Sequence, residues 1–184
     1  MKKIITILCL LIFYSTNAQN NTLQQEFIND VINNERYLSK NQSLIVKRNI
    51  TKNGILSQNI KEFLKKKKNI FPNKIDLNDS LVLTKTDYKI ISTELKKDET
   101  IDWNKLNFQN IEFSDEENWE ILALDFKNHS FLELGKPIFL KNNTIAICSE
   151  IYLCSRDCGY NYFGFYKKID GKWKQWIPIN KGYF

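Results

Sequence analysis

The sequence predicts an α+β domain in which N-terminal helices pack on a C-terminal antiparallel β-meander of about four or more strands. Apolar residues in the first part of the chain recur at helical spacing, whereas the C-terminal part alternates at strand spacing. Aromatic residues make up 13% of the chain. This share favours a packed core over disorder.

Residues 1–18 are typical of a secretory signal peptide. Lys2 and Lys3 precede an apolar run over residues 4–13, and residues 16–18 offer a small-residue cleavage site. The run is shorter than the ~20 residues that are needed to cross a bilayer. We therefore expect a cleaved leader and a mature protein exported to the periplasm or the extracellular space, where disulfides are stable.

Residues 19–184 are predicted to form a single domain, because no linker, repeat or low-complexity block interrupts them. The leader carries two lysines and no acid, so the formal charge falls from +6 for the full chain to +4 for the mature protein. Such a modest excess in an exported protein predicts no nucleic-acid partner. No later segment is apolar enough to span a membrane, so an integral membrane protein is not expected.

Two amphipathic helices are predicted in the N-terminal half. From Thr22 to about Tyr37 the apolar side chains share one face, and Thr22 with Gln25 matches a capping box. A second helical pattern runs from Ser57 to about Lys68. It ends in four lysines, which we interpret as a solvated helix end, with contact to an anionic envelope surface as the alternative. Residues 43–50 between the helices predict a short strand.

The middle of the chain gives mixed indications. Short β-like runs at residues 81–83 and 88–91 predict two strands. Residues 101–113 carry apolar side chains without a clear period. Residues 114–117 predict the start of a helix, because they form a capping box with acids at the positive end of the helix dipole. A strand through residues 120–126 is the alternative.

The C-terminal part is the clearest. Four antiparallel strands are predicted over residues 137–140, 144–153, 160–168 and 173–177. Lys141-Asn142-Asn143 marks the first turn, and Asp170-Gly171 is a two-residue hairpin signal. Alternation in the second and third strands places aliphatic and phenylalanine side chains on one face of the sheet and tyrosines on the other.

Three cysteines follow the leader, namely Cys148, Cys154 and Cys158. We expect a structural disulfide between Cys154 and Cys158, because they flank a hairpin turn in an exported protein. A redox-active pair and a three-cysteine zinc site are the alternatives. Cys148 is interpreted as a small buried hydrophobic residue. Its alternatives are a bond to one of the other cysteines or to another chain, or a nucleophile that pairs with His129.

No catalytic residue, metal ligand or cofactor is assigned. His129 is the one histidine and is predicted to lie in a polar loop, so multi-histidine metal sites are excluded. The sequence contains no nucleophile elbow, phosphate-binding glycine loop or zinc-protease motif. Turns and a helix cap account for the acids at 76, 79 and 115–117. An envelope hydrolase that uses carboxylates or a Cys/His pair is the alternative function.

The tyrosine face and the hairpin tip are the candidate binding surfaces, since amphipathic aromatic side chains suit a protein or glycan partner. The alternative is that the N-terminal helices cover this face. The candidate residues are Tyr152, Arg156, Asp157, Tyr160, Tyr162, Tyr166 and Trp176. We expect a non-catalytic binding or interaction module, in one variety inhibitor-like, whose partner is a protein or an envelope component.

A pattern of aromatic residues, glycines and cysteines runs from about Trp119 to Trp176. It consists of Trp119, Pro137, Phe139, Ala146, Cys154, Cys158-Gly159-Tyr160, Gly164, Tyr166-Lys167 and Gly171-Lys172-Trp173. This pattern resembles a group of small uncharacterised exported bacterial proteins with a C-terminal hairpin ending in Gly-Lys-Trp. The resemblance covers about a third of the chain and departs from the group at residues 155–157, where glycine is common. It implies export and a C-terminal sheet, and it implies no activity.

Overall fold

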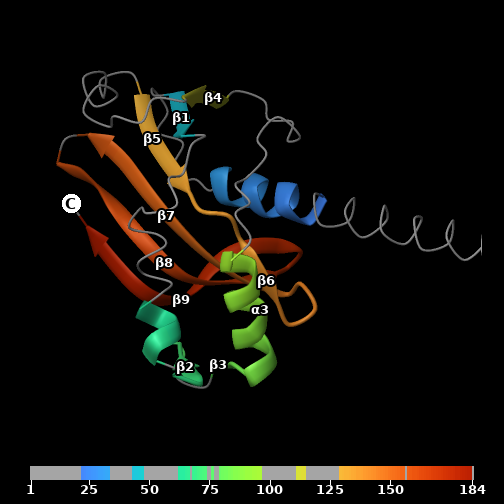
Figure 1. Ribbon diagram of the computed structural model, residues 1–184. Coiled ribbons are helices and arrows are strands. Elements are labelled where there is room, and N and C mark those ends of the chain that lie inside the picture. The colour runs from blue at the N-terminus through green and yellow to red at the C-terminus, as the bar shows by residue number, and fades with distance from the viewer. Residues whose placement is uncertain are drawn as a thin grey trace, which may run out of the picture.

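The computed structural model describes residues 22–33, 43–47, 62–66, 68–73, 76, 79–96, 111–114, 129–155 and 157–183. These residues form a mixed α/β fold with three helices, a seven-stranded sheet that is mostly antiparallel, and a two-stranded sheet (Figure 1). The prediction of helices packed with a large antiparallel sheet is confirmed at this level. Within the described residues, no helix has both the length and the apolar character that crossing a bilayer requires.

The large sheet has the strand order β4-β1-β5-β7-β8-β9, and β6 also pairs with β7. Its strands are β1 (Ser43–Lys47), β4 (Ile111–Ser114), β5 (His129–Leu134), β6 (Ile138–Leu140), β7 (Ile145–Ser155), β8 (Cys158–Ile169) and β9 (Lys172–Tyr183). The pairs among β6, β7, β8 and β9 are antiparallel, as predicted, and β5, which the sequence analysis did not predict as a strand, also pairs antiparallel with β7. The sheet is nevertheless mixed and not a pure meander, because β1 pairs in parallel with both β4 and β5.

The helices are not confined to the N-terminal part, which corrects the predicted arrangement. The predicted strand at residues 88–91 belongs to α3 (Lys85–Lys96), which follows two strands. A capping box starts this helix, since the backbone N–H of Thr84 donates to the Asp87 carboxylate and the backbone N–H of Asp87 donates to Thr84 Oγ1. The short segment Tyr88–Ile91 fits a strand or a helix equally well, and the capping box at Thr84 favours the helix.

The other predicted elements are confirmed where the structure describes them. Residues 22–32 and 62–66 are helical, and β1 lies at the predicted strand. The strand predicted at residues 81–83 corresponds to β3 (Ser80–Val82), which pairs with β2 (Ile70–Pro72). Residues 34–37, 57–61 and 67 of the predicted helices and residues 115–128 lie outside the described residues, whereas Lys68, the predicted end of the second helix, is not helical.

Both predicted hairpin turns are present. Lys141, Asn142 and Asn143 connect β6 to β7 with φ values of 52°, 55° and 63°. Asp170 and Gly171 connect β8 to β9 with φ values of 52° and 75°. Positive φ at both central residues is the geometry that a two-residue hairpin requires, and Asn, Asp and Gly adopt it most readily.

The large sheet is buried on both faces, so the molecule has three layers. One face packs against the helix 22–32. The buried residues of this tyrosine-side core are Phe27, Ile28, Val31, Ile32, Leu44, Val46, Leu132, Leu134, Ala146, Cys148, Tyr152, Tyr160, Tyr162, Tyr166 and Trp173. The opposite face packs against the helix 62–66, the β2–β3 pair and α3. The buried residues of this phenylalanine-side core are Phe63, Phe71, Leu81, Leu83, Ile91, Ile138, Leu140, Ile145, Ile147, Phe163, Phe165 and Ile177.

Candidate functional site

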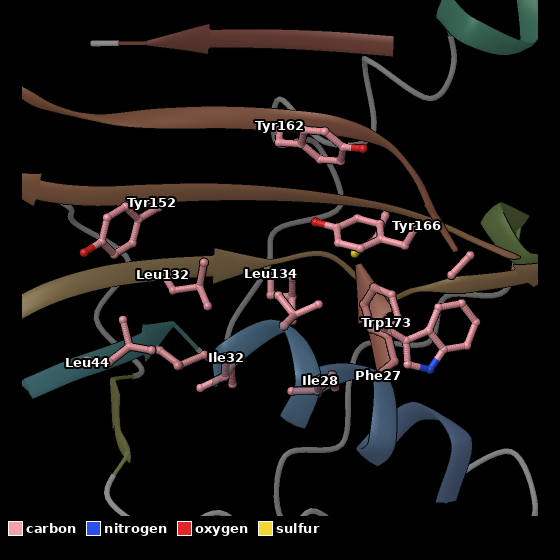
Figure 2. Close-up of a cluster of buried hydrophobic side chains, with 14 of the residues drawn as sticks. Phe27, Ile28, Ile32, Leu44, Leu132, Leu134, Tyr152, Tyr162, Tyr166 and Trp173 are labelled. Carbon is pink, nitrogen blue, oxygen red and sulfur yellow. The ribbon is translucent and has the colours of Figure 1, made fainter. Parts of the chain in front are cut away.

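The four candidate tyrosines of the sheet are core residues. Tyr152, Tyr160, Tyr162 and Tyr166 are 5%, 8%, 3% and 1% exposed. Figure 2 shows Tyr152, Tyr162 and Tyr166 along the sheet, with Tyr166 near Phe27 of the helix 22–32. The expectation of an open tyrosine surface is therefore wrong for this structure. The alternative that the N-terminal helices cover this face holds in part, because the helix 22–32 packs on it and the helix 62–66 packs on the opposite face. The strand alternation identified the face, but the tertiary contact with the helix determines its exposure.

Two phenol groups on this face, those of Tyr160 and Tyr162, donate internal hydrogen bonds. Glu150 is fully buried, and its carboxylate accepts hydrogen bonds from Tyr160 Oη at 3.1 Å and from Gln175 Nε2. Tyr162 Oη donates to the carbonyl oxygen of Phe165 at 2.9 Å. A buried carboxylate needs such donors, because it has lost its water. Tyr160 and Gln175 therefore stabilise a buried carboxylate inside the core.

Trp176 lies half-buried on the opposite face, where it anchors the loop between β2 and β3. Its Nε1 donates to Asp79 Oδ2 at 2.5 Å, and Lys167 Nζ lies 3.3 Å from Asp79 Oδ1. Lys167 Nζ also lies 4.4 Å from the centre of the Trp176 ring. Desolvation acts to raise the pKa of Asp79, but the hydrogen bonds from Trp176 and Lys167 outweigh it, so the pKa lies below its ordinary value. Trp176 is thus committed to a structural contact.

The hairpin tip between β7 and β8 is closed by a disulfide between Cys154 and Cys158, whose Cα atoms lie 5.2 Å apart. The predicted pairing is confirmed. Asp157 is exposed at this tip, whereas Arg156 lies outside the described residues. Of the candidate binding residues that the structure describes, Asp157 is the one with an exposed side chain.

Cys148 is a buried free cysteine, as predicted. Its Sγ donates to the carbonyl oxygen of Gly135 at 3.1 Å. Burial, together with the nearby charge of Glu150, raises the pKa of the thiol well above its ordinary value. The thiol therefore stays protonated near neutral pH, which argues against a nucleophilic role.

His129 is the first residue of β5 and not a loop residue, which corrects the sequence prediction. Phe131 pairs with Leu153, so His129 lies level with Ser155 on β7, far along the strand from Cys148. At about 3.3 Å per residue, the stretch of β7 from Cys148 to the position level with His129 is roughly 23 Å long. A Cys/His catalytic pair is therefore excluded in this structure.

The partner of His129 is Ser43, whose Oγ lies 2.6 Å from His129 Nδ1. Both side chains are half-buried, and they meet because Ser43 and His129 are register partners in the parallel β1–β5 pair. The sequence analysis missed this contact. No local pattern indicates it, because 86 residues separate the two positions. Within the described ranges, no three His, Cys, Asp or Glu side chains lie close enough together to hold a metal ion.

A groove of about 540 Å³ lies between the helix 62–66, β2 and β9. Figure 1 shows this helix next to the middle of the sheet edge that β9 forms. The groove is lined by Glu62, Phe63, Lys66, Lys68, Phe71, Pro72, Phe163, Ile177, Pro178, Ile179 and Asn180. Four buried side chains form its floor, namely Phe63, Phe71, Phe163 and Ile177. Exposed Glu62, Lys66, Lys68 and Asn180 form its rim.

Ring contacts fix the floor of the groove. The Phe63 ring lies 5.5 Å from that of Phe71 and 6.0 Å from that of Phe163, measured between centroids. Lys68 is held at the border between floor and rim. Its carbonyl oxygen accepts a hydrogen bond from Tyr88 Oη at 2.5 Å, and its Nζ lies 5.6 Å from the centre of the Phe71 ring. The lysine run is solvated, as predicted, at each of its described positions.

Comparisons with known proteins add no relative: no protein-family model, no curated protein and no solved structure matches this chain.

Proposed function

We propose that the protein is an exported, non-catalytic binding module whose ligand site is the groove between the helix 62–66, β2 and β9. The observation that carries the proposal is the combination of a buried aromatic floor with an exposed charged rim around a volume of about 540 Å³. Ligand sites are typically concave, largely apolar and supplied with a few polar groups that orient the ligand.

The composition of the groove supports binding over catalysis. Among the described residues that line it there is no cysteine, serine, threonine or histidine, and Glu62 is the single carboxylate. Nucleophilic catalysis requires a nucleophile beside a base, and glycoside hydrolysis requires two carboxyl groups. The groove therefore offers recognition surface without a catalytic pair.

Two features support export. The first eighteen residues match a signal peptide, and the Cys154–Cys158 disulfide suits an oxidising compartment such as the periplasm or the extracellular space. An inhibitor-like variety of the proposal would use the disulfide-closed tip, where Asp157 is exposed.

One observation favours a second candidate function, an envelope hydrolase. The Ser43 hydroxyl and the His129 ring form a hydrogen-bonded pair of a nucleophile type and a base type, at 2.6 Å. In this candidate His129 would take the proton from Ser43 as its oxygen attacks an acyl carbon, and would pass that proton to the leaving group.

Chemical-shift mapping by NMR separates the two candidates. We would titrate indole, a neutral aromatic probe, into the isotope-labelled mature protein. The proposal predicts shifts of the backbone amides of groove residues such as Lys66, Phe71 and Ile179. It also predicts that Asn180→Trp, which fills the groove from its rim, abolishes them, while Lys172→Trp elsewhere on β9 does not.

Shifts that avoid the groove would contradict the proposed site. Covalent labelling of Ser43 by a fluorophosphonate, lost in Ser43→Ala and His129→Gln, would favour the hydrolase instead.

A further inference from the structure

We infer that the ligand of the groove is a small amphiphilic anion, an apolar chain or ring that carries one carboxylate or phosphate group. This inference rests on the proposed function and names the chemical class of its ligand. It follows from the floor, the rim and the edge of the groove taken in turn.

The floor selects an apolar body. Phe63, Phe71, Phe163 and Ile177 come from four elements, and all four are held in the phenylalanine-side core. Because their positions are fixed by packing, an apolar group that enters the groove displaces water without ordering a loose surface. A volume of about 540 Å³ also falls within the range of small-molecule sites.

The rim selects a negative head group. Lys66 and Lys68 contribute two positive charges, against one negative charge from Glu62. Lys68 Nζ lies at 5.6 Å from the centre of the Phe71 ring, so one ammonium group stands directly where the aromatic floor meets water. A ligand whose tail lies on this floor places its head group beside that ammonium, and a charge-assisted hydrogen bond to carboxylate or phosphate results.

The edge of the sheet argues against an extended peptide. Pro178 lines the groove on β9 and has no N–H to donate to an added strand. β9 also carries Lys172, Lys174 and Lys181, which are exposed. Proline and lysine on an edge strand are the features with which natural sheets prevent further pairing. The groove is therefore suited to a small molecule that needs no backbone hydrogen bonds.

Isothermal titration of the disulfide-intact mature protein tests the inference. The probes are decanoate, decyltrimethylammonium and acetate, each below its micelle concentration, together with vesicles of anionic phospholipid. We expect decanoate to bind, decyltrimethylammonium to bind at least about tenfold more weakly, and acetate to show no binding, because the site needs both the chain and the negative charge.

Matched lysine variants test where the head group of the ligand binds. Lys66→Ala and Lys68→Ala are each expected to weaken decanoate binding about fivefold, which is the effect of losing one ammonium partner at a partly exposed site. Lys65→Ala removes the same charge from the same lysine run, but Lys65 is exposed and does not line the groove. The Lys65→Ala variant should therefore bind decanoate with the same affinity as the unaltered protein. Circular dichroism establishes that each variant is folded.

The outcomes separate failure of the inference from failure of the proposed function. Equal binding of decanoate and decyltrimethylammonium in the groove would overturn the anionic head group while leaving the binding site in place. Equal losses in Lys65→Ala and Lys66→Ala would overturn a defined head-group position. Binding to vesicles but not to free decanoate would replace the small ligand with a membrane surface. If none of the probes, indole included, binds in the groove, both proposals would be overturned.

Discussion

Asp87 shows how one side chain connects two elements of this fold. Its carboxylate accepts hydrogen bonds at 2.7 Å from both the N–H and the hydroxyl of Thr84, and Lys141 Nζ lies 2.7 Å away. Thr84 precedes α3, whereas Lys141 belongs to the turn between β6 and β7. Desolvation acts to raise the pKa of Asp87, but these three partners outweigh it and hold the pKa below its ordinary value.

The first prediction concerns the acid sensitivity that Asp87 confers. Since its pKa is lower in the folded state, the carboxylate contributes full stability above the ordinary value of 3.8, and this contribution is lost as the pH falls through the folded-state pKa. We expect Asp87→Asn to lower the free energy of unfolding by about 1–3 kcal/mol at pH 7. Urea unfolding from pH 7 to pH 2 should show this difference shrink in acid. A difference that stays constant would contradict the assignment.

The second prediction concerns Cys148. Because burial and the Glu150 charge raise the pKa of its thiol, we expect no reaction with a disulfide reagent at pH 8 in the folded protein and one fast-reacting thiol per chain after unfolding in urea. A thiol count with mass mapping of the Cys154–Cys158 bond provides the measurement. Rapid labelling of Cys148 in the folded protein would contradict its placement in the core.

At the scale of elements, the helix 22–32 encloses the tyrosine-side core. Phe27 lies at the centre of this contact, with its ring centroid 5.0 Å from that of Tyr166 and 5.4 Å from that of Trp173 (Figure 2). The ring of Phe139 lies 5.9 Å away. Edge-to-face packing of this kind adds to the hydrophobic stabilisation. The backbone N–H of Trp173 also donates to Asp30 Oδ2 at 2.9 Å, which holds the helix to the start of β9.

The third prediction follows from this packing. We expect Phe27→Ala to destabilise the protein by about 3–5 kcal/mol, because it leaves a cavity among three aromatic rings. The control is Glu26→Ala on the same helix. Glu26 forms a partly exposed ion pair with Lys168, so its loss should cost less than about 1 kcal/mol. Chemical denaturation measures the loss of unfolding free energy in both variants. Equal losses would contradict the central place of Phe27 in the tyrosine-side core.

Elements whose cues are local could be predicted from the sequence. The β7–β8–β9 hairpins and the disulfide follow from alternation, turn residues and close cysteine spacing, all within a short stretch. The parallel pairing of β1 could not be predicted, because β4 and β5 lie far along the chain and no turn encodes their contact. The α3 helix was missed because its apolar run was weighed without the cap that Thr84 and Asp87 form.

At the scale of the whole molecule, both faces of the sheet are covered, and the groove lies where the cover of one face ends. Its lining comes from the helix 62–66, β2, β8 and β9. Taken alone, each of these segments is explained as part of a helix or a strand, and the described lysines of the lysine run are solvated, as predicted. The groove forms only through tertiary packing, so no local sequence pattern predicts it. Strand periodicity predicts the tyrosine face as the binding surface instead.

The fourth prediction is the central one, that the groove is the ligand site. A crystal structure of the mature protein grown with decanoate tests it most directly. We expect the acyl chain to lie against Phe63 and Phe71, with a carboxylate oxygen about 2.7–2.9 Å from Nζ of Lys66 or Lys68. A groove filled by another segment of the chain, or decanoate bound only elsewhere on the molecule, would contradict the account.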